Sequence, residues 1–284
     1  MMRMLLAVTL AVSSIAVVRT ASPQSRPAHS SFVPPRGANV VTVTAREYAF
    51  DMPASIPAGL TSFVLRDAGA QPHHLMLFRL DRGKNLTDAF HALTTTAALP
   101  SWMHAAGGPN TPAPGGGVAN GTLVLEPGEY VVFCMVPSPD GTPHFARGMA
   151  RGLTVRPSSH TVTTLPAGDI TVTMHDYDFI FSSPPTHGHH TIAVRNAGRQ
   201  AHELILSRLA PGKTSLDFVR WIETQDGPPP VTPIGGITDL PPGGEMLMEV
   251  DLGPGSYSLL CRVRDAGDGK PHDAHGMSRD FVVK

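Results

Sequence analysis

Short segments in which apolar and polar residues alternate run along the chain from about residue 40 onward. Examples are "VVTVTA", "TSFVLRD", "HLMLFRL", "TLVLE" and "YVVFC". Alternation with a period of two places apolar side chains on one face of a strand. Turn residues separate the segments at the spacing of roughly 8–12 residues that is typical of β-sandwiches and barrels. The pattern predicts an all-β fold.

Two segments break the strand pattern and predict one short helix in each half of the chain, "NLTDAFHAL" and "TSLDFVRWIET". Each opens with an N-cap residue, Asn85 or Thr214. An aspartate follows three positions later, Asp88 or Asp217, as in a capping box. A loop rich in Gly and Pro comes after each helix.

The chain also repeats itself at an offset of nearly constant length. "VTVTAREYAF" returns as "ITVTMHDYDF", and "FVLRDAGAQPHHLML" returns as "IAVRNAGRQAHELIL". Further on, "PGEYVVFC" matches "PGSYSLLC", and "PHFARGMARGLTV" matches "PHDAHGMSRDFVV". Such a period is far too long for a solenoid, so it indicates one domain made twice. We expect the domains at residues 38–157 and 158–284.

The N-terminus has the features of a secretory signal peptide. One Arg precedes an apolar run from Leu5 to Val18, which is short for a membrane span. We expect a signal peptide at residues 1–21 and a disordered, Pro- and Ser-rich leader at 22–37. An uncleaved anchor is the alternative. The protein is therefore expected to be exported, periplasmic or extracellular, with no stable membrane insertion after cleavage.

The amino-acid composition agrees with a β protein and gives no sign of nucleic-acid binding. The chain has 28 Gly and 28 Pro, which suits a β protein with many turns. Its formal net charge is −1 and like charges do not cluster, so nothing indicates binding to nucleic acid.

Four residue types that ligate metals recur at matched positions: a His that opens a strand, then a Cys, a His and a Met on one loop. They are His73, Cys134, His144 and Met149 in the first copy, and His202, Cys261, His272 and Met277 in the second. Two imidazoles, a thiolate and a weak thioether are the donors of a trigonal blue-copper site with an axial Met. The pattern predicts two copper ions per chain, one in each copy.

With these motifs the chain resembles the cupredoxins, the family of plastocyanin, azurin and the blue-copper domains of larger enzymes. The resemblance covers nearly all of residues 40–284 and rests on "N/D-x-G-x-x-x-H", "Y-x-x-x-C" and "P-H-x-x-x-G-M". It implies that the two halves, each with its inserted helix, are tandem Greek-key β-sandwich domains. It also implies two type 1 coppers held by the eight residues above, and single-electron transfer between redox partner proteins. In the family, the His of the Cys loop commonly reaches the surface.

Two departures from family patterns bear on function. Nitrite reductases that resemble this chain place a His before the Cys to bind a catalytic copper, whereas Phe133 and Leu260 stand here. Catalytic copper ligands are therefore not evident, and we do not expect an enzyme. The residue after the first ligand is Asn in many small cupredoxins but His74 or Glu203 here, which leaves the redox potential open.

Three other interpretations stay open on sequence alone. Two cysteines in an exported protein often form a disulfide, although a disulfide explains neither the His nor the Met that accompanies each Cys. A copper storage or delivery protein would use the same ligands without redox partners. A nitrite reductase or oxidase would need a catalytic copper at a domain or subunit interface.

Overall fold

The computed structural model describes residues 32–95, 99–159 and 161–284. The signal peptide predicted at 1–21, and the predicted leader up to residue 31, lie outside these residues. No helix in the described ranges is both long enough and apolar enough to cross a membrane. The predicted domain boundary at 157/158 falls in the connection between strands β9 and β10.

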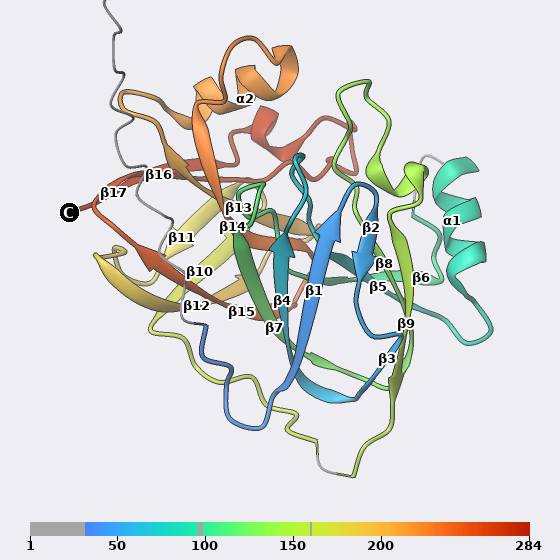
Figure 1. Ribbon diagram of the computed structural model, residues 1–284. Coiled ribbons are helices and arrows are strands. Elements are labelled where there is room, and N and C mark those ends of the chain that lie inside the picture. Colours follow the sequence, from blue (N-terminus) through green and yellow to red (C-terminus); the bar gives the residue numbers. More distant parts are fainter. Residues whose placement is uncertain (1–31, 96–98, 160) are drawn as a thin grey trace, which may run out of the picture.

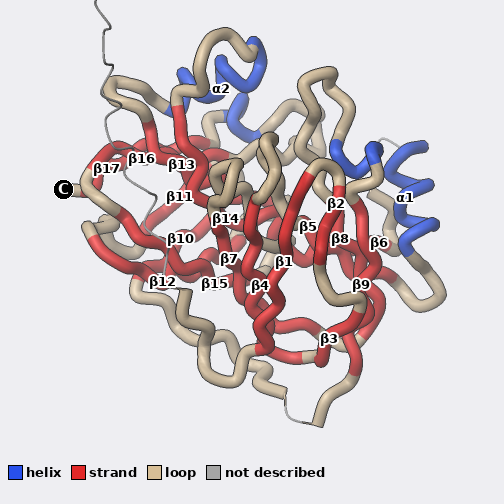
Figure 2. Tube along the Cα trace, viewed as in Figure 1, coloured by secondary structure: helices blue, strands red, loops and turns tan. Residues whose placement is uncertain are grey.

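Strands dominate the described chain, as the alternating pattern predicts (Figure 2). In the N-terminal half, one sheet has the order β2 (Ala49–Asp51), β1 (Asn39–Arg46), β4 (Gly59–Asp67) and β7 (Val118–Leu125). The second sheet has the order β3 (Ser55–Pro57), β9 (Ala150–Arg156), β8 (Gly128–Phe133), β5 (Met76–Leu80) and β6 (Met103–Gly107). Strand β1 pairs with β4 in parallel, which requires a crossover between the sheets.

The C-terminal half repeats this arrangement. One sheet has the order β11 (Asp178–Phe181), β10 (Ile170–His175), β12 (Gly188–Asn196) and β15 (Glu245–Leu252). The other has the order β14 (Val231–Leu240), β13 (His202–Leu209), β16 (Gly255–Leu260) and β17 (Ser278–Val283). Strand β10 pairs with β12 in parallel, as β1 does with β4. The duplication seen in the sequence is therefore a duplication of the fold.

Each half buries its apolar residues between its two sheets. In the N-terminal half Val43 and Leu65 from one sheet belong to the same core cluster as Leu77 and Val132 from the other. Alternate residues of β1 are buried, which is the two-residue period expected of a strand with one face in a core. This confirms an all-β fold of two β-sandwiches.

The two halves share one continuous sheet at the centre of the molecule. Strand β7 pairs with β15 at Thr122 and Leu247, which joins four strands from each half (Figure 1). The segment that precedes β7 also meets strand β14, because Pro109 forms an isolated antiparallel bridge with Ile237. The halves therefore contact each other through backbone as well as side chains.

Both predicted helices form, with the predicted caps. Helix α1 (Leu86–Thr95) begins after Asn85, whose side chain accepts from the amides of Thr87 and Asp88. Helix α2 (Ser215–Thr224) begins after Thr214, in a capping box with Asp217. Each helix covers the outer face of the sheet that carries the cysteine (Figure 1).

Candidate metal centres

Three of the predicted donors meet in the buried core of the N-terminal half. The Nδ1 atoms of His73 and His144 lie 3.1 Å apart. The Sγ atom of Cys134 is 4.0 Å from Nδ1 of His73 and 3.5 Å from Nδ1 of His144. All three side chains are fully buried. Residues separated by as many as 71 positions thus present their donor atoms to one point.

The C-terminal half builds the same cluster. The Nδ1 atoms of His202 and His272 are 3.0 Å apart. The Sγ atom of Cys261 lies 3.9 Å from the first and 3.4 Å from the second. The two cysteines belong to separate clusters and are both free, which argues against a disulfide between them.

The spacing of the donors fits one metal ion per cluster. A triangle with either set of sides has a centre about 2 Å from each corner, within the range of about 2.0–2.3 Å that a first-row ion makes with imidazole nitrogen and thiolate sulfur. Two imidazoles and one thiolate are also the chemical set that a type 1 copper uses. The two clusters therefore fit two type 1 copper sites.

The fourth predicted ligand lies on the same loop as the Cys and the second His. Met149 and Met277 are fully buried. In each loop the amide of the Met donates to the carbonyl of the His, at 3.1 Å for Met149 and 3.0 Å for Met277, and the Cys amide donates back to the Met carbonyl. The structure thus brings each Met backbone beside its Cys and His.

The glycine before each methionine explains how the loop turns. Short 3₁₀ helices, His144–Arg147 and His272–His275, end at Gly148 and Gly276. These glycines have φ of 102° and 95°, in the left-handed region that residues with a Cβ avoid. The "G-M" of the sequence motif is therefore a turn that returns the chain to its strand.

A polar residue at the end of the preceding strand fixes the first histidine of each half. Asp67 accepts from the amides of Gly69 and His73, at 3.0 and 2.9 Å. Its counterpart Asn196 accepts from the Gly198 amide and donates to the carbonyl of Gln200. These bonds explain the "N/D-x-G-x-x-x-H" motif, because the side chain of its first residue holds a tight turn that directs the histidine inward.

A hydrogen bond at Nε2 orients one imidazole in each half. His202 Nε2 lies 3.0 Å from Asp176 Oδ1, and His144 Nε2 lies 3.2 Å from Gln71 Oε1. A carboxylate or an amide oxygen can only accept, so these Nε2 atoms carry the proton and their Nδ1 lone pairs face the cluster. Metal-binding histidines usually donate their other N–H in this way.

The two sites are not identical in these contacts. Glu47 Oε1, the counterpart of Asp176, lies 3.5 Å from His73 Nε2. Gln200, the counterpart of Gln71, donates to Asp265 instead of accepting from the loop histidine. The C-terminal site therefore has a closer carboxylate on its first histidine than the N-terminal site has.

In the metal-free protein, burial shifts the pKa values of the candidate Cys and His ligands and so determines their protonation. It raises the pKa of Cys134 to about 12, and raises the pKa of Cys261 well above its ordinary value. It lowers the pKa of His144 and of His272 to about 4. The imidazoles are thus neutral and ready to ligate at neutral pH, whereas each thiol must lose its proton to become a ligand.

The expectation that the loop histidine reaches the surface is wrong for this chain. His144 and His272 are 0% exposed. Tyr48 packs edge-on against His144 with ring centroids 4.9 Å apart, and Tyr177 packs against His272 at 5.4 Å. Hydrogen bonds hold both tyrosines. Ser138 and Gln71 donate to the hydroxyl of Tyr48, whereas the hydroxyl of Tyr177 donates to Asp265 and accepts from Gln200.

The residue before each cysteine points away from the donors. Phe133 belongs to an apolar cluster with Phe78, Phe145 and side chains of α1. Leu260 belongs to the matching cluster beneath α2, which includes Phe218. The space beside these positions is filled by packed hydrocarbon.

The residue after each first ligand joins the two loops of its site. His74 Nε2 accepts from the amide of Met135 at 2.8 Å, and Glu203 Oε1 accepts from the amide of Arg262 at 3.0 Å. In this chain a His or a Glu makes the hydrogen bond between the two ligand loops that the resemblance assigns to an Asn. The amide that donates follows directly after the Cys in both halves.

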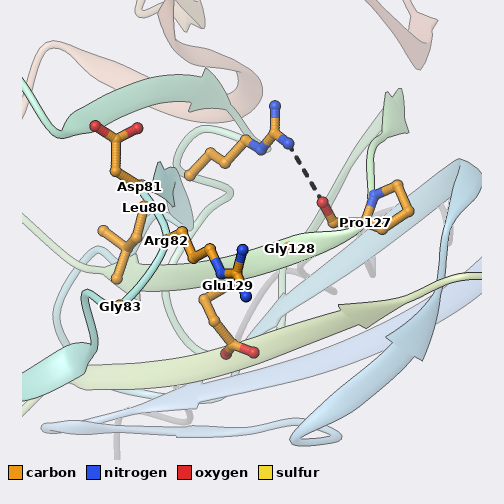
Figure 3. Close-up of a pocket in the computed structure, with 8 residues that line it drawn as sticks. Leu80, Asp81, Arg82, Gly83, Pro127, Gly128 and Glu129 are labelled. Atoms are coloured by element: carbon orange, nitrogen blue, oxygen red, sulfur yellow. Dashed lines mark hydrogen bonds between the residues drawn. The ribbon is translucent and has the colours of Figure 1, made fainter.

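Two other features of the described chain do not belong to these sites. Asp265, Asp268 and His275 bring donor atoms together at the rim of the C-terminal site, but these side chains already bond to neighbouring amides and to one another. A cleft of about 310 Å³ lies between Arg79–Gly83 and Pro127–Glu129 (Figure 3). It contains none of the candidate ligands, and the bond from Arg79 to the Pro127 carbonyl recurs between Arg208 and Pro254.

No family model matches the chain, and none of the curated proteins does. Among solved structures, reduced auracyanin from Roseiflexus castenholzii is 21% identical, covers 42% of this chain and 98% of its own, and has a TM-score of 0.30. Copper nitrite reductase from Nitrosomonas europaea is 14% identical, covers 87% of this chain and 94% of its own, and has a TM-score of 0.25. The assignment of copper to the two clusters therefore rests on the identity and spacing of their donor atoms.

Both halves are cupredoxin-like. Each is a β-sandwich with a His–Cys–His donor set between its sheets, and the chain carries two such sets. All six predicted His and Cys ligands converge, in two groups of three.

Several residues that shape the sites escaped the sequence analysis. Glu47, Tyr48 and Gln71 are matched at the repeat offset by Asp176, Tyr177 and Gln200. A comparison of the copies for shared polar residues would have found them. Asn110, which donates to Glu203 from the other half of the chain, has Thr238 as its counterpart, so the repeat gives no signal for it.

Proposed function

We propose that this protein is an exported two-domain blue-copper electron carrier. His73, Cys134, His144 and Met149 would hold one type 1 copper, and their counterparts His202, Cys261, His272 and Met277 a second. When bound, the metal supplies a one-electron couple between Cu(II) and Cu(I). Redox partner proteins would deliver and accept the electrons.

The observation that carries this proposal is the convergence of the donors. Three buried donor atoms per site lie 3.0 to 4.0 Å apart. Hydrogen bonds to Asp67, Asp176 and Gln71, and bonds within the loop backbone, hold the residues that carry them. A rigid set that suits both oxidation states keeps structural change small when an electron moves, which favours transfer over uptake and release.

The chain's own residues perform three tasks in this account. Neutral imidazoles present Nδ1 lone pairs, and at His144 and His202 an acceptor holds the Nε2 proton. Tyr48 and Tyr177 cover the loop histidines, and so exclude water and small ligands from the donors. Backbone bonds from the Met to the His keep the long loop closed.

The same features weigh against the other two functions. Delivery of copper needs a site that opens, whereas all six His and Cys side chains are fully buried. Inner-sphere catalysis needs an open metal position, and packed apolar side chains surround Phe133 and Leu260, where an adjacent catalytic copper would need imidazole.

The proposal is tested with copper-loaded protein. We expect an intense thiolate-to-Cu(II) charge-transfer band that bleaches with a mild reductant and returns with an oxidant over many cycles without loss of metal. A colourless protein that holds only Cu(I) and yields it to a chelator would support storage. Turnover of nitrite or oxygen that survives removal of adventitious metal would support an enzyme.

A further inference from the structure

The two donor clusters are connected to each other through buried side chains at the domain interface. Two of these are His74 and Glu203, the residues that follow the first ligand of each site. Each bonds to the amide next to its own cysteine, Met135 in one half and Arg262 in the other. Each therefore links the two segments that supply the donors of its site. Both side chains are buried, with 7% and 8% of their surface exposed.

Asn110 joins these two side chains. Its Nδ2 donates to Glu203 Oε2 at 3.0 Å, from the N-terminal half to the C-terminal half. Its side chain also interacts with the ring of His74. Asn110 is 1% exposed, so water does not compete for these contacts. The three residues form one buried bridge, which we call the His74–Asn110–Glu203 bridge.

Backbone symmetry places Asn110 at this point. The Asn110 amide donates to the Gly236 carbonyl, and the amide of its counterpart Thr238 donates to the Gly108 carbonyl, each at 2.8 Å. The segment around Asn110 and the end of strand β14 thus pair symmetrically, around a local two-fold axis.

Glycine makes this close approach possible. A Cβ on Gly108 would lie 2.0 Å from the carbonyl oxygen of Leu75, and one on Gly236 would lie 1.8 Å from that of Leu204. Leu75 and Leu204 follow His74 and Glu203 directly in the sequence. Both segments are therefore packed closely against the residues that carry the bridge.

The centre of the bridge is asymmetric. Thr238 occupies the position equivalent to Asn110, but its Oγ1 lies beside backbone carbonyls, 3.2 Å from Gly108 and 3.4 Å from Leu75. A carboxamide is long enough to reach across the interface. Of this symmetric pair, Asn110 is thus the residue whose side chain contacts both His74 and Glu203.

We propose that the His74–Asn110–Glu203 bridge carries electrons between the two sites. This inference rests on the proposed function, since it assumes copper at both donor sets. From Cys134 the route runs through the Met135 amide, His74, Asn110, Glu203 and the Arg262 amide to Cys261. One site loses an electron and the other gains it, and no bond forms or breaks. The chain would therefore accept an electron at one copper site and deliver it from the other.

The test uses Asn110→Leu, which keeps the side-chain size and removes the hydrogen bonds. Asn120→Leu is the matched control. Asn120 also ties the halves, since it donates to the Glu249 carbonyl at 2.9 Å and accepts from the Glu249 amide at 2.7 Å, but it does not touch the bridge.

Copper-loaded protein is reduced with less than one equivalent of a fast reductant, and freeze-quench EPR follows how the electron redistributes between the two Cu(II) signals. In the wild type we expect a first-order phase whose rate does not depend on protein concentration. Asn110→Leu should slow this phase about tenfold or more, in line with the effect of losing an outer-shell hydrogen bond. Asn120→Leu should leave the rate unchanged.

Copper content, the EPR spectrum of the oxidised protein and thermal unfolding of the apoprotein show whether each variant keeps its sites and its fold. If Asn110→Leu does not fold, Asn110→Ser replaces it, because its short side chain does not reach Glu203. A variant with both coppers and the wild-type rate would overturn the bridge. So would a wild-type phase that accelerates with protein concentration. A wild type without blue-copper signals would overturn the proposed function as well.

Discussion

Asp176 accepts a hydrogen bond from Nε2 of His202 at 3.0 Å, whereas the equivalent Glu47 lies 3.5 Å from His73. A carboxylate that accepts from a ligating imidazole makes the imidazole a stronger donor and favours the more positive metal ion. The C-terminal site should therefore have the lower reduction potential of the two. A redox titration that separates the two EPR signals should show this order.

Replacing the carboxylate tests the cause of that difference. Asp176→Asn should raise the potential of the C-terminal site and leave the N-terminal site unchanged, because an amide bears no charge. Asp178→Asn, at an exposed position of strand β11, is a control for the loss of one nearby carboxylate. Equal shifts in both variants would mean that general charge, and not the contact with His202, sets the potential.

Copper binding should release protons. Burial raises the pKa of Cys134 to about 12, so the free thiol is protonated across the physiological range, whereas the histidines are neutral because burial lowers the pKa of His144 to about 4. Each site should therefore release about one proton, and its affinity should fall about tenfold for each unit by which pH is lowered. Calorimetry in buffers of different ionisation heat measures the release. An affinity independent of pH between 6 and 8 would contradict thiolate ligation.

The left-handed turn before Met149, the predicted axial ligand, should be sensitive to a Cβ. Gly148 has φ of 102°, so Gly148→Ala should destabilise the apoprotein by about 1–2 kcal/mol. It should also perturb the visible spectrum, because Met149 follows directly. Gly152→Ala is the matched control: its Cβ would meet only Leu86, at 4.0 Å. Chemical denaturation and the visible spectrum read out both effects, and equal behaviour of the two variants would refute this role for Gly148.

The rims of the two sites predict different responses to salt. Met135, Val136 and Pro143 surround the N-terminal loop, whereas Arg264 and Lys270 lie on the C-terminal loop. Charged rims steer encounter and are screened over about 8–10 Å at ordinary ionic strength. In electron transfer with a small redox protein, Cys134→Ser, which keeps only the C-terminal site, should show the steeper dependence on ionic strength. Identical slopes for this variant and Cys261→Ser would mean that the loops do not select partners.

Much of the fold could be predicted because it depends on local patterns. Two-residue alternation gives the strands, and Asn85 and Thr214 with their aspartates give the helix starts. The ligand clusters could be predicted because the duplication pairs each Cys with the same His and Met. Chance does not readily explain a His and a Met that accompany a Cys in both copies, so the repeat itself indicates a shared function.

The contacts around the donors could not be predicted, because they depend on tertiary structure that no local sequence pattern encodes. Burial of His144 results from Tyr48, which comes from a different part of the chain and covers the imidazole. The tie made by His74 needs the Met135 amide to lie opposite it, although 61 residues separate the two. Asn110 has its role only because the two halves pack around a two-fold axis.

Copper stoichiometry and EPR of the wild type and of the two cysteine variants test the central claim most directly. The structure predicts two type 1 coppers per chain, because each half holds a complete set of buried donors. Cys134→Ser and Cys261→Ser should each lose one copper and one of two distinguishable blue-copper signals, while the other remains. One copper in the wild type, or two in either variant, would contradict the account.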